Sequence, residues 1–500
     1  MMLPLAATAV APVGNWPFAV LAICVAFIIV AITKLRMHAF LALILAAFLA
    51  GFLTEQFATS AIDRLPAAMR PEAQANSWIA AVELTAVEFG GAAGSIAISI
   101  GLAAIIGLCL MESGGADKVV RRFLAAFGEK RAAFALLTAT YFLSIPIFFD
   151  TMFMLMVPIA RALRLRTGKS YLLYIMAICA AGVLTHSLTV PHPGPLAMVD
   201  NLRVDAGLSM FWGIIAGIIP CLVGFYLVKW MDTKMEVPLR ETAGMTMADM
   251  EQAASKPESD LPPFGWSVAP VLLPIMLIGL GSMFKVAAGY PGFVEMLGGV
   301  ESMTEISKIV YFIGNKNIAL AVGAAIAIWV LARQRKLTLS RVGELLDAPI
   351  STAATIILIT AAGGAFGAML RHAGVGDAIK VIAVEYSIDV LFLGWMTAVV
   401  IRVAQGSATV AMLTTSAIIW PMMDPATNPA LPYNHMYVFL AIGFGAFAAS
   451  WMNDSGFWVV SKLGGITEKE MLKTFTVMMT VLSIVGLIVT LIASRLLPLV

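Results

Sequence analysis

Long apolar segments recur along this chain, and some of them are interrupted by residues that a membrane-spanning helix avoids. A helix needs about 20 apolar residues to cross a bilayer. Of the 500 residues 60% are hydrophobic and only 12% are charged, against about 25% charged in soluble domains, and the mean hydropathy is +0.92. The sequence therefore predicts an all-α polytopic membrane protein. The uninterrupted candidate spans are Trp16–Ile32, His38–Leu53, Ala93–Leu110, Ser209–Val228, Ser267–Phe284, Ile318–Leu331, Thr352–Leu370 and Phe475–Ser494.

Two further apolar segments are broken near their C-terminal ends. Tyr171–Val199 contains the stretch THSLTVPHPGP, and Met436–Val460 contains NDSG. Proline removes a backbone donor and clashes with the preceding helical turn. In a membrane, backbone freed in this way is tolerated where it lines a cavity. The breaks therefore predict helix ends and free backbone groups around a polar site.

Two segments of about 30 residues, Ala132–Ala160 and Val390–Trp420, are longer than one crossing needs. Basic clusters flank Ala132–Ala160 at both ends, and such clusters mark cytoplasmic loops. This segment is expected to enter and return as a re-entrant hairpin, turning near Ser144–Pro146. Val390–Trp420 lies between poorly basic loops, so it should enter from the outside and turn near Gln405–Gly406.

The two halves of the chain share landmarks at an almost constant separation. Asp117 and Asp377, Pro158 and Pro421, and Gly194 and Gly456 are related by offsets of 260 to 263 residues, which suggests an internal repeat. The boundaries predicted are a first repeat at 1–231, a cytoplasmic linker at 232–265 and a second repeat at 266–500. Charge placement makes the repeats inverted and puts both termini on the non-cytoplasmic side. The clusters expected in the cytoplasm are Lys34–Arg36, Lys118–Arg131, Arg161–Lys169, Lys229–Lys256, Arg333–Arg341 and Lys462–Lys473.

Inverted repeats with discontinuous helices are typical of secondary transporters, whose broken segments form the substrate site near the membrane midplane. Within these segments isolated charges are costly, so each is a functional candidate. Asp150 is the only charge in the first hairpin, and we expect burial to keep it partly protonated, as a proton carrier or a substrate-facing acid. A structural acid paired with a neighbouring helix is the alternative.

Arg402 is the only charge in the second hairpin. A guanidinium binds a carboxylate in two-point geometry and stays protonated. It could hold an organic anion, or it could neutralise Asp150 or Asp454, and the sequence leaves both open.

His192 and Asp454 occupy matching repeat positions, in PHPGP and NDSG. A histidine can carry a proton near neutral pH, although a structural hydrogen-bonding role is the alternative, and His186 is interpreted as structural. The predicted proton-coupling residues are Asp150, His192 and Asp454. The predicted substrate-binding residues are Arg402, Gln405, Gly406, Ser407, Thr409, His192, Gly194, Asn453 and Ser455.

Several classes of function are disfavoured. The net charge of +2 is too small to indicate a nucleic-acid partner. The four cysteines lie in apolar runs without a C-x-x-C pair, so neither a disulfide nor a metal site is expected. The phosphate-binding motif G-x-x-x-x-G-K-[ST] and the zinc motif H-E-x-x-H do not occur, which argues against an ATP-driven pump. No cofactor is predicted.

Three stretches, THSLTVPHPGPLA, RVAQGSATVAML and MNDSGFWVVSKLGGIT, together resemble matching segments of the gluconate permease family of proton symporters. The resemblance extends over nearly the whole chain. It implies an elevator-type fold with two inverted repeats, a homodimer in the cell inner membrane, and proton-coupled uptake of a small organic anion such as gluconate. Two positions depart from the family pattern: Asp150 stands where a glutamate is common, and Trp451 where a histidine is found.

The main hypothesis is therefore proton-coupled symport of a small hydroxylated carboxylate. A sodium-coupled carboxylate carrier or a cation/proton antiporter on the same scaffold is the alternative, because unwound carbonyls with Asp454 could hold sodium. An intramembrane enzyme built around His192 and Asp454 is a remote third hypothesis.

Overall fold

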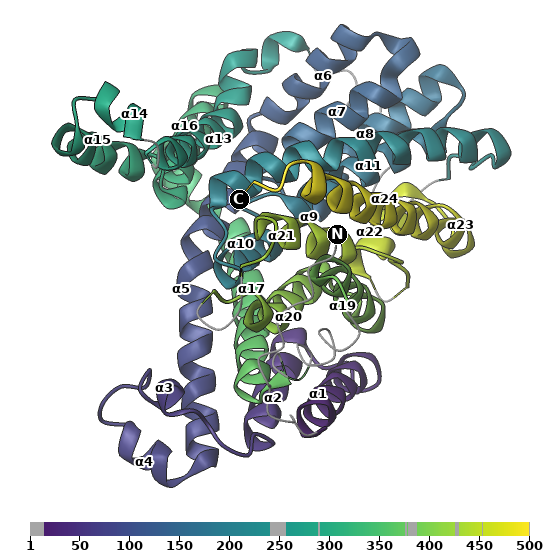
Figure 1. Cartoon of the computed structure of the whole chain (residues 1–500). Helices are drawn as coiled ribbons and strands as arrows, with labels where there is room; N and C mark the ends of the chain where they lie inside the picture. The colour runs from purple at the N-terminus through teal and green to yellow at the C-terminus, as the bar shows by residue number, and fades with distance from the viewer. Residues whose placement is uncertain are drawn as a thin grey trace.

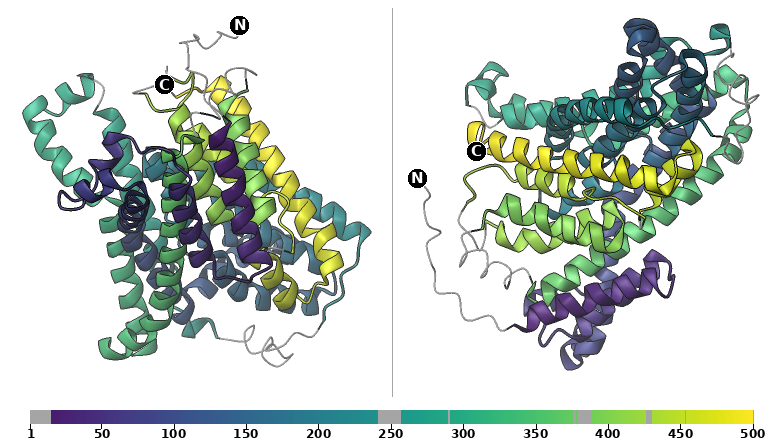
Figure 2. Two further views of the ribbon diagram at one scale, coloured as in Figure 1. Left: turned by 90° about the horizontal axis from the view of Figure 1, so that it is seen from below. Right: turned by 90° about the vertical axis from the view of Figure 1, so that its right-hand side faces the viewer.

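The computed structural model describes residues 15–240, 257–288, 291–375, 378, 388–425, 430–452 and 454–499. All regular structure in these ranges is helical. Seven helical stretches within them are long and apolar enough to cross a membrane, which fits a multi-pass membrane protein. The long helices run side by side in a broad bundle (Figure 2).

The helices of the first half cover residues 16 to 234. They are α1 (Trp16–Thr33), α2 (Ala39–Phe52), α3 (Thr59–Ile62), α4 (Arg70–Ala75), α5 (Ser77–Glu112), α6 (Gly115–Phe127), η1 (Glu129–Arg131), α7 (Ala132–Leu143), α8 (Phe149–Thr167), α9 (Tyr171–Leu188), α10 (Pro193–Asn201) and α11 (Ala206–Lys234).

The remaining helices follow the linker. They are η2 (Glu258–Asp260), α13 (Phe264–Ala287), α14 (Pro291–Met296), α15 (Val300–Ile313), α16 (Lys316–Arg335), α17 (Leu339–His372), α19 (Val390–Gln405), α20 (Ala408–Ile419), η3 (Trp420–Met422), α21 (Met436–Gly445), α22 (Ser455–Gly464), α23 (Glu468–Lys473) and α24 (Phe475–Leu496).

The two longest helices, α5 and α17, extend well beyond the apolar stretches that predicted them. They contain 36 and 34 residues, about 54 and 51 Å at 1.5 Å per residue. Side-chain caps by Asn76 and Thr338 set their N-terminal ends. The two helices pack against each other over much of their length, with α2 and α16 alongside (Figure 1). They form one wall of the molecule, and α14 and α15 project to one side next to α13 and α16.

Both segments predicted as hairpins are interrupted where the sequence places the turn. In the first, α7 ends at Leu143 and α8 begins at Phe149. In the second, α19 ends at Gln405, and Gly406 adopts a φ of +86°, a left-handed conformation that glycine adopts without a Cβ penalty. Helices α7 and α20 have 12 residues each, about 18 Å, which is too short to cross a core of about 30 Å.

Pro158, near the end of the predicted segment Ala132–Ala160, lies inside α8, which continues to Thr167 and ends at Gly168, in a left-handed conformation. Its repeat counterpart Pro421 lies in η3, directly after α20. The two prolines therefore occupy different local structures, and their matching positions are weaker evidence for a repeat than the sequence suggested. Asp377, of another landmark pair, lies outside the described residues.

Both broken segments are discontinuous helices. The chain leaves α9 at Leu188, passes through a cis peptide bond between Val190 and Pro191, and re-enters a helix at Pro193. In the second half α21 ends at Gly445 and α22 begins at Ser455. A long helix, a hairpin, a broken helix and a final long helix thus occur in this order twice, ending in α11 and in α24. The inverted relation of the two sets, and the boundaries at 231 and 266, stay predictions.

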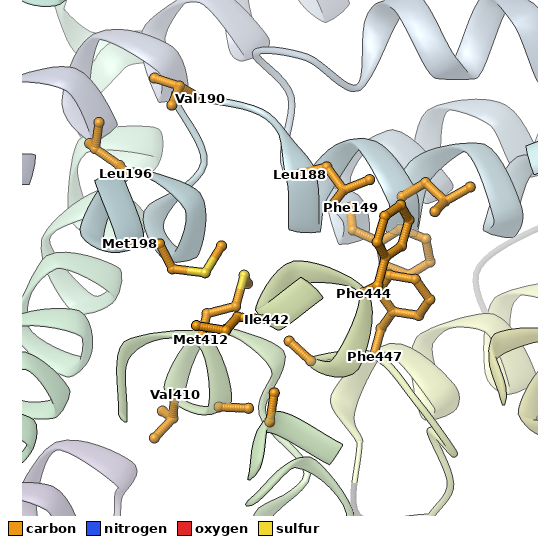
Figure 3. Close-up of a cluster of buried hydrophobic side chains, with 14 of the residues drawn as sticks. Phe149, Leu188, Val190, Leu196, Met198, Val410, Met412, Ile442, Phe444 and Phe447 are labelled. Atoms are coloured by element: carbon orange, nitrogen blue, oxygen red, sulfur yellow. The ribbon is translucent and has the colours of Figure 1, made fainter. Parts of the chain in front are cut away.

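Apolar side chains from both halves meet where the broken elements converge (Figure 3). Phe149 and Leu188, from the first half, belong to the same buried cluster as Met412 and Phe444, from the second. Gly194 is part of this contact, because a Cβ at that position would lie 2.1 Å from Cε of Met412. The hairpins and broken helices therefore pack as one body rather than as two separate halves.

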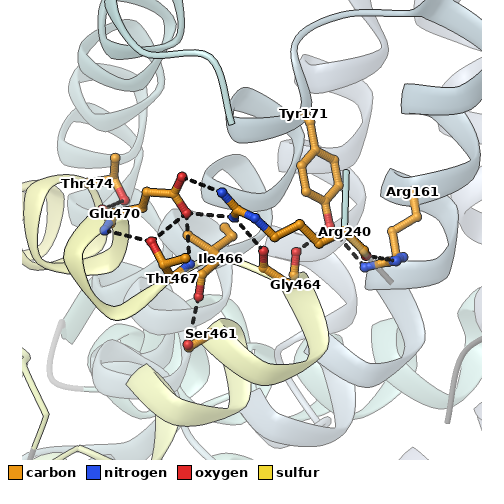
Figure 4. Close-up of polar contacts among 10 residues, drawn as sticks. Arg161, Tyr171, Arg240, Ser461, Gly464, Ile466, Thr467, Glu470 and Thr474 are labelled. Atoms are coloured by element: carbon orange, nitrogen blue, oxygen red, sulfur yellow. Dashed lines mark hydrogen bonds and ion pairs between the residues drawn. The ribbon is translucent and has the colours of Figure 1, made fainter. Parts of the chain in front are cut away.

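A polar network joins the start of the linker to both halves (Figure 4). Arg240 donates to both carboxylate oxygens of Glu470, at 2.7 and 2.8 Å, and to the carbonyl of Gly465 at 2.9 Å. The fully buried Arg161, at the cytoplasmic side predicted for α8, donates to the backbone carbonyl of Arg240. The hydroxyl of Tyr171 donates to the carbonyl of Gly464 over 2.6 Å. Hairpin, linker and broken helix are thus held together at one end.

Candidate functional site

A cavity of about 390 Å³ lies where the broken elements of both halves meet. Its walls come from the start of α8, the end of α9, the middle of α17, the turn between α19 and α20, and the break between α21 and α22. The lining residues are Phe148, Phe149, Asp150, Val183, His186, Ser187, Pro193, Ile356, Ile359, Thr360, Arg402, Gly406, Ser407, Ala408, Thr409, Phe447, Ser450, Asp454, Ser455, Gly456 and Phe475.

Arg402 is the permanent cation of this cavity, and its side chain is 4% exposed. Its Nη2 donates to Oδ2 of Asp454 at 2.5 Å and to Oγ of Ser450 at 2.6 Å. Its Nη1 donates to the carbonyl of Gly406, which the left-handed turn leaves free of the helix. The buried Nε has no partner among the described residues. Of the two roles that the sequence left open, neutralisation of Asp454 is the contact formed here, with one guanidinium nitrogen still unpaired.

Asp454 caps α22 while it binds Arg402. Its Oδ1 accepts from the backbone N–H of Gly456 at 3.0 Å, and its Oδ2 accepts from Arg402 and from the hydroxyl of Ser450. The side chain is 12% exposed. An aspartate at the N-cap is common because its carboxylate satisfies free N–H groups of the first turn. Both oxygens are therefore engaged, and the buried charge is compensated.

Asp150 lines the same cavity from the first turn of α8, where its side chain is exposed. Its part in proton coupling stays a prediction. The hairpin turn ends one residue earlier, so the acid faces the space between the broken elements. A negative group is also favoured near the N-terminal end of a helix. Within the described structure Asp150 has no hydrogen bond or ion pair.

His192 lies behind the cavity wall and is 1% exposed. Its Nε2 is 2.6 Å from the carbonyl of Ser144, so this nitrogen carries a hydrogen and donates. The contact joins the turn of the first hairpin to the break between α9 and α10. The ring of His186, centred 4.6 Å from that of His192, lines the cavity instead. The hydrogen bond of His192 fits the structural role considered for it, and its part in proton coupling stays a prediction.

The other predicted binding residues are distributed unevenly. Gly406, Ser407, Thr409 and Ser455 line the cavity. Ser407 also caps α20, since its hydroxyl accepts from the N–H of Val410. Gly194 is not part of the lining, and it allows the close contact with α20 described above. The side chains of Gln405 and Asn453 lie outside the described residues, so their roles stay predictions.

Four polar lining residues belong to neither predicted set, the substrate-binding or the proton-coupling residues. They are His186, Ser187, Thr360 and Ser450. Ser187 lies within the stretch THSLTVPHPGP, so its position gave some signal. The sequence around Ser450 and Thr360 gives no signal of a binding role, because small hydroxyl residues in apolar segments usually make hydrogen bonds within the helix bundle. Their place at the cavity depends on the packing of α17 and on the break after α21.

The arrangement is suited to an anion that carries hydroxyl groups. A guanidinium recognises a carboxylate, while hydroxyls such as those of Ser407, Thr409 and Ser455 both donate and accept. Aromatic and aliphatic side chains, including Phe447 and Ile359, form the rest of the wall. No cluster of metal-binding side chains occurs in the described part of the chain.

Comparison with known proteins places these features in a family context. Residues 76–496 match the model of the family described as GntP family permease. A gluconate permease of Pseudomonas aeruginosa is 32% identical over 474 residues, which cover 93% of this chain and 95% of the relative. The inner membrane permease YgbN of Escherichia coli is 32% identical over 80% of this chain and 86% of its own length. The Gnt-II system L-idonate transporter of Escherichia coli is 27% identical over 94% of this chain and 98% of its own length.

Two solved transporter structures share the fold at low sequence identity. The YdaH transporter of Alcanivorax borkumensis has a TM-score of 0.57 at 14% identity, with 97% of this chain and 100% of that chain covered. MtrF of Neisseria gonorrhoeae, from a class of antimetabolite efflux pumps, has a TM-score of 0.57 at 15% identity. The match covers 92% of this chain and 94% of that chain.

Proposed function

Because this chain belongs to the GntP family of permeases, we propose that it imports a small hydroxylated carboxylate, gluconate or a related sugar acid, together with protons. The chain is a multi-pass membrane transporter and not an enzyme, as the permeases that it matches over most of its length indicate. The inner membrane is the proposed location, by analogy with YgbN.

The observation that carries this proposal is the cavity at the meeting point of the four broken elements. Its buried Arg402 has an unpaired Nε, which can donate to a substrate carboxylate while Nη2 stays bound to Asp454. Ser407, Thr409 and Ser455 line the same cavity and can bind substrate hydroxyls. A volume of about 390 Å³ lies in the range of small-molecule sites.

The charges of the cavity support proton coupling. Among the described lining residues, Arg402 is the permanent cation, and Asp150 and Asp454 are the carboxylates. When a substrate carboxylate enters, three anionic groups surround one cation, and like charges close together disfavour ionisation. One proton on Asp150 cancels the charge that the substrate adds, because Asp454 is already bound to Arg402. Substrate and proton are then taken up together.

The sodium-coupled alternative is less well supported by the same contacts. Both oxygens of Asp454 have partners, so this carboxylate would have to leave Arg402 before it could bind a cation. The exposed Asp150 is the remaining carboxylate of the lining. A cation/proton antiporter would leave the unpaired Nε of Arg402 without a ligand.

The second part of the proposal concerns the symmetry, the motion and the oligomeric state of the protein. We infer that the two sets of helices are inverted repeats, that the hairpins and broken helices move together as an elevator against the wall formed by α5 and α17, and that the protein is a homodimer. The repeated order of elements and the shared packing of both hairpins support the first two, and the family resemblance supports the third.

Reconstitution of the purified protein into vesicles tests the function. Gluconate should accumulate when the outside is acidic, collapse of the pH gradient by a protonophore should abolish accumulation, and exchange of sodium for potassium should have no effect. Accumulation that needs sodium and ignores the protonophore would replace protons as the coupling ion. Absence of binding across a panel of sugar acids and hydroxy acids, measured by thermal shift, would overturn the substrate class.

A further inference from the structure

Two hydroxyl groups on the cavity wall have no partner, although the residues that carry them are fully or almost fully buried. They are Oγ of Ser187, at the end of α9, and Oγ1 of Thr360, in the middle of α17. Ser187 is 0% exposed and Thr360 is 1% exposed. We propose that Ser187 and Thr360 form a hydroxyl-reading subsite, which selects a polyhydroxylated carboxylate over one that lacks hydroxyls along its chain.

The hydroxyl of Thr360 behaves differently from its neighbours on the same helix. Thr352 and Thr355 donate to the carbonyls of Ala348 and Ser351, one turn earlier, at 3.1 and 3.3 Å. This is the usual arrangement for threonine inside a helix. Thr360 makes no such bond within the described structure, and its residue lines the cavity. Its donor and acceptor are therefore available to a ligand.

Ser187 stands in a similar contrast to its own neighbours. Thr185 donates to the carbonyl of Ala181 at 2.9 Å, and Thr189 donates to the carbonyl of Thr185 at 2.6 Å. Ser187 lies between them, in the last turn of α9, where the helix breaks. Its hydroxyl has no partner among the described residues, and the residue lines the cavity. One hydroxyl in the last turn of α9 is therefore unused within the described structure.

An unpaired hydroxyl in a buried wall carries a free-energy penalty, because burial removes it from water. A ligand hydroxyl removes the penalty, since each partner both donates and accepts. A ligand without that hydroxyl leaves the protein group unpaired. Sites built to hydrogen-bond a substrate hydroxyl reject analogues that lack it much more strongly than apolar pockets reject an added group. Ser187 and Thr360 thus discriminate between carboxylates by the hydroxyl groups along the ligand's chain.

The two residues also come from different parts of the molecule. Ser187 belongs to a broken helix, whereas Thr360 belongs to α17, which packs mainly against α5 and α2. Ile356 and Ile359, from the same turns of α17, are apolar parts of the lining. Thr360 is accordingly the polar contact that α17 offers to the substrate. This inference rests on the proposed function, since it presupposes that a sugar acid occupies the cavity.

The test is a titration of the purified full-length protein with gluconate and with a series of deoxygluconates, each lacking one hydroxyl. Thr360→Val keeps the branched shape and removes the hydroxyl, so gluconate affinity should fall about 2-fold to 10-fold. Thr360→Ser should retain most of the affinity. For the deoxygluconate that lacks the paired hydroxyl, wild type and Thr360→Val should bind equally. Ser187→Ala should show the same pattern with a different member of the series.

Thr352→Val is the matched control, because its hydroxyl is used within the helix and its residue is exposed away from the lining. It should leave the affinity for gluconate unchanged. If wild type binds gluconate and both Thr360→Val and Ser187→Ala lose the same factor for every deoxygluconate, or lose nothing, the subsite is refuted and the proposed function stands. If wild type binds no member of the series, the proposed function itself falls, and the inference with it.

Discussion

Nη2 of Arg402 lies 2.5 Å from Oδ2 of Asp454, so the turn of the second hairpin is bound to the break between α21 and α22. Ser450, at the same break, accepts from Nη2 and donates to the same carboxylate oxygen. The contact is buried on both sides, with exposures of 4% and 12%. It positions the guanidinium at the cavity and compensates its charge, while Nε remains unpaired.

Breaking this pair from one side should be costly. Asp454→Asn leaves a buried guanidinium without its counterion, and such losses typically lower the free energy of unfolding by about 3–5 kcal/mol. The measurement is thermal or denaturant unfolding in detergent. The double variant Arg402→Gln/Asp454→Asn should regain part of that stability but bind no sugar acid. Additive losses in the double variant would mean that the two residues do not stabilise each other.

Arg402→Lys should weaken binding of the sugar acid although it keeps the positive charge. A lysine has no Nε–H in the guanidinium plane and no fork to hold Asp454 and a substrate carboxylate together. A lost charge-assisted hydrogen bond costs about 1.5–3 kcal/mol, or roughly 10-fold to 100-fold in affinity. Titrations with gluconate and with its uncharged lactone check this. Equal wild-type affinity for the two ligands would leave Arg402 with a purely structural role.

Asp150→Asn should abolish accumulation driven by a pH gradient and preserve exchange of labelled for unlabelled substrate. The amide keeps the size of the side chain but cannot take up a proton. The measurement is proton and substrate uptake into vesicles. Asp63→Asn is the control, because Asp63 lies beyond the cavity, on the loop after α3. Unchanged accumulation in Asp150→Asn would move the coupling role to His192 or Asp454.

Gly213→Ala should prevent stable folding. A Cβ at this position would lie 2.0 Å from the carbonyl oxygen of Leu188, which is backbone and cannot rotate away. Gly90→Ala, in α5, is the matched control, because nothing lies within 4 Å of its added Cβ. There alanine should be neutral or stabilise, since glycine inside a helix costs about 1 kcal/mol. The comparison is the yield of monodisperse protein and its melting temperature; equal values for the two variants would contradict the close approach of α9 and α11.

Two single-cysteine variants test which loops lie on the cytoplasmic side of the membrane, as predicted from charge. Glu236→Cys, at the start of the linker, should be protected from a membrane-impermeant thiol reagent in intact cells, and Glu72→Cys, in α4, should be labelled. Both positions are exposed, the Glu236 side chain to 85%. The four native cysteines are buried and should react little. Labelling in the opposite sense would reverse the topology and place both termini in the cytoplasm.

Local features of the sequence were sufficient for most of the helices and for their breaks. The uninterrupted helices were predicted from apolar length, and the turns at Ser144 and Gly406 from proline, glycine and the distribution of charge. These signals are local, because a proline or a glycine acts on the turn in which it stands. Pro158 shows the limit of such reasoning: α8 accommodates it and continues to Thr167. The polar ends of α5 and α17 lie beyond the apolar length that predicts these helices.

The sequence by itself determined which charges and helix breaks are energetically costly in an apolar environment. These charges include Asp150, Arg402 and Asp454, and they are the candidate functional residues. Only the tertiary structure decided which of these pair. Arg402 and Asp454 are 52 residues apart, and nothing in either segment distinguishes Asp454 from Asp150 as the partner. It also decided that Asp150 faces the cavity and that Thr360 joins the site. Pairing and exposure depend on the distances between elements that fold far apart in the chain, and those distances exist only after α8, α9, α17 and the two breaks have packed together.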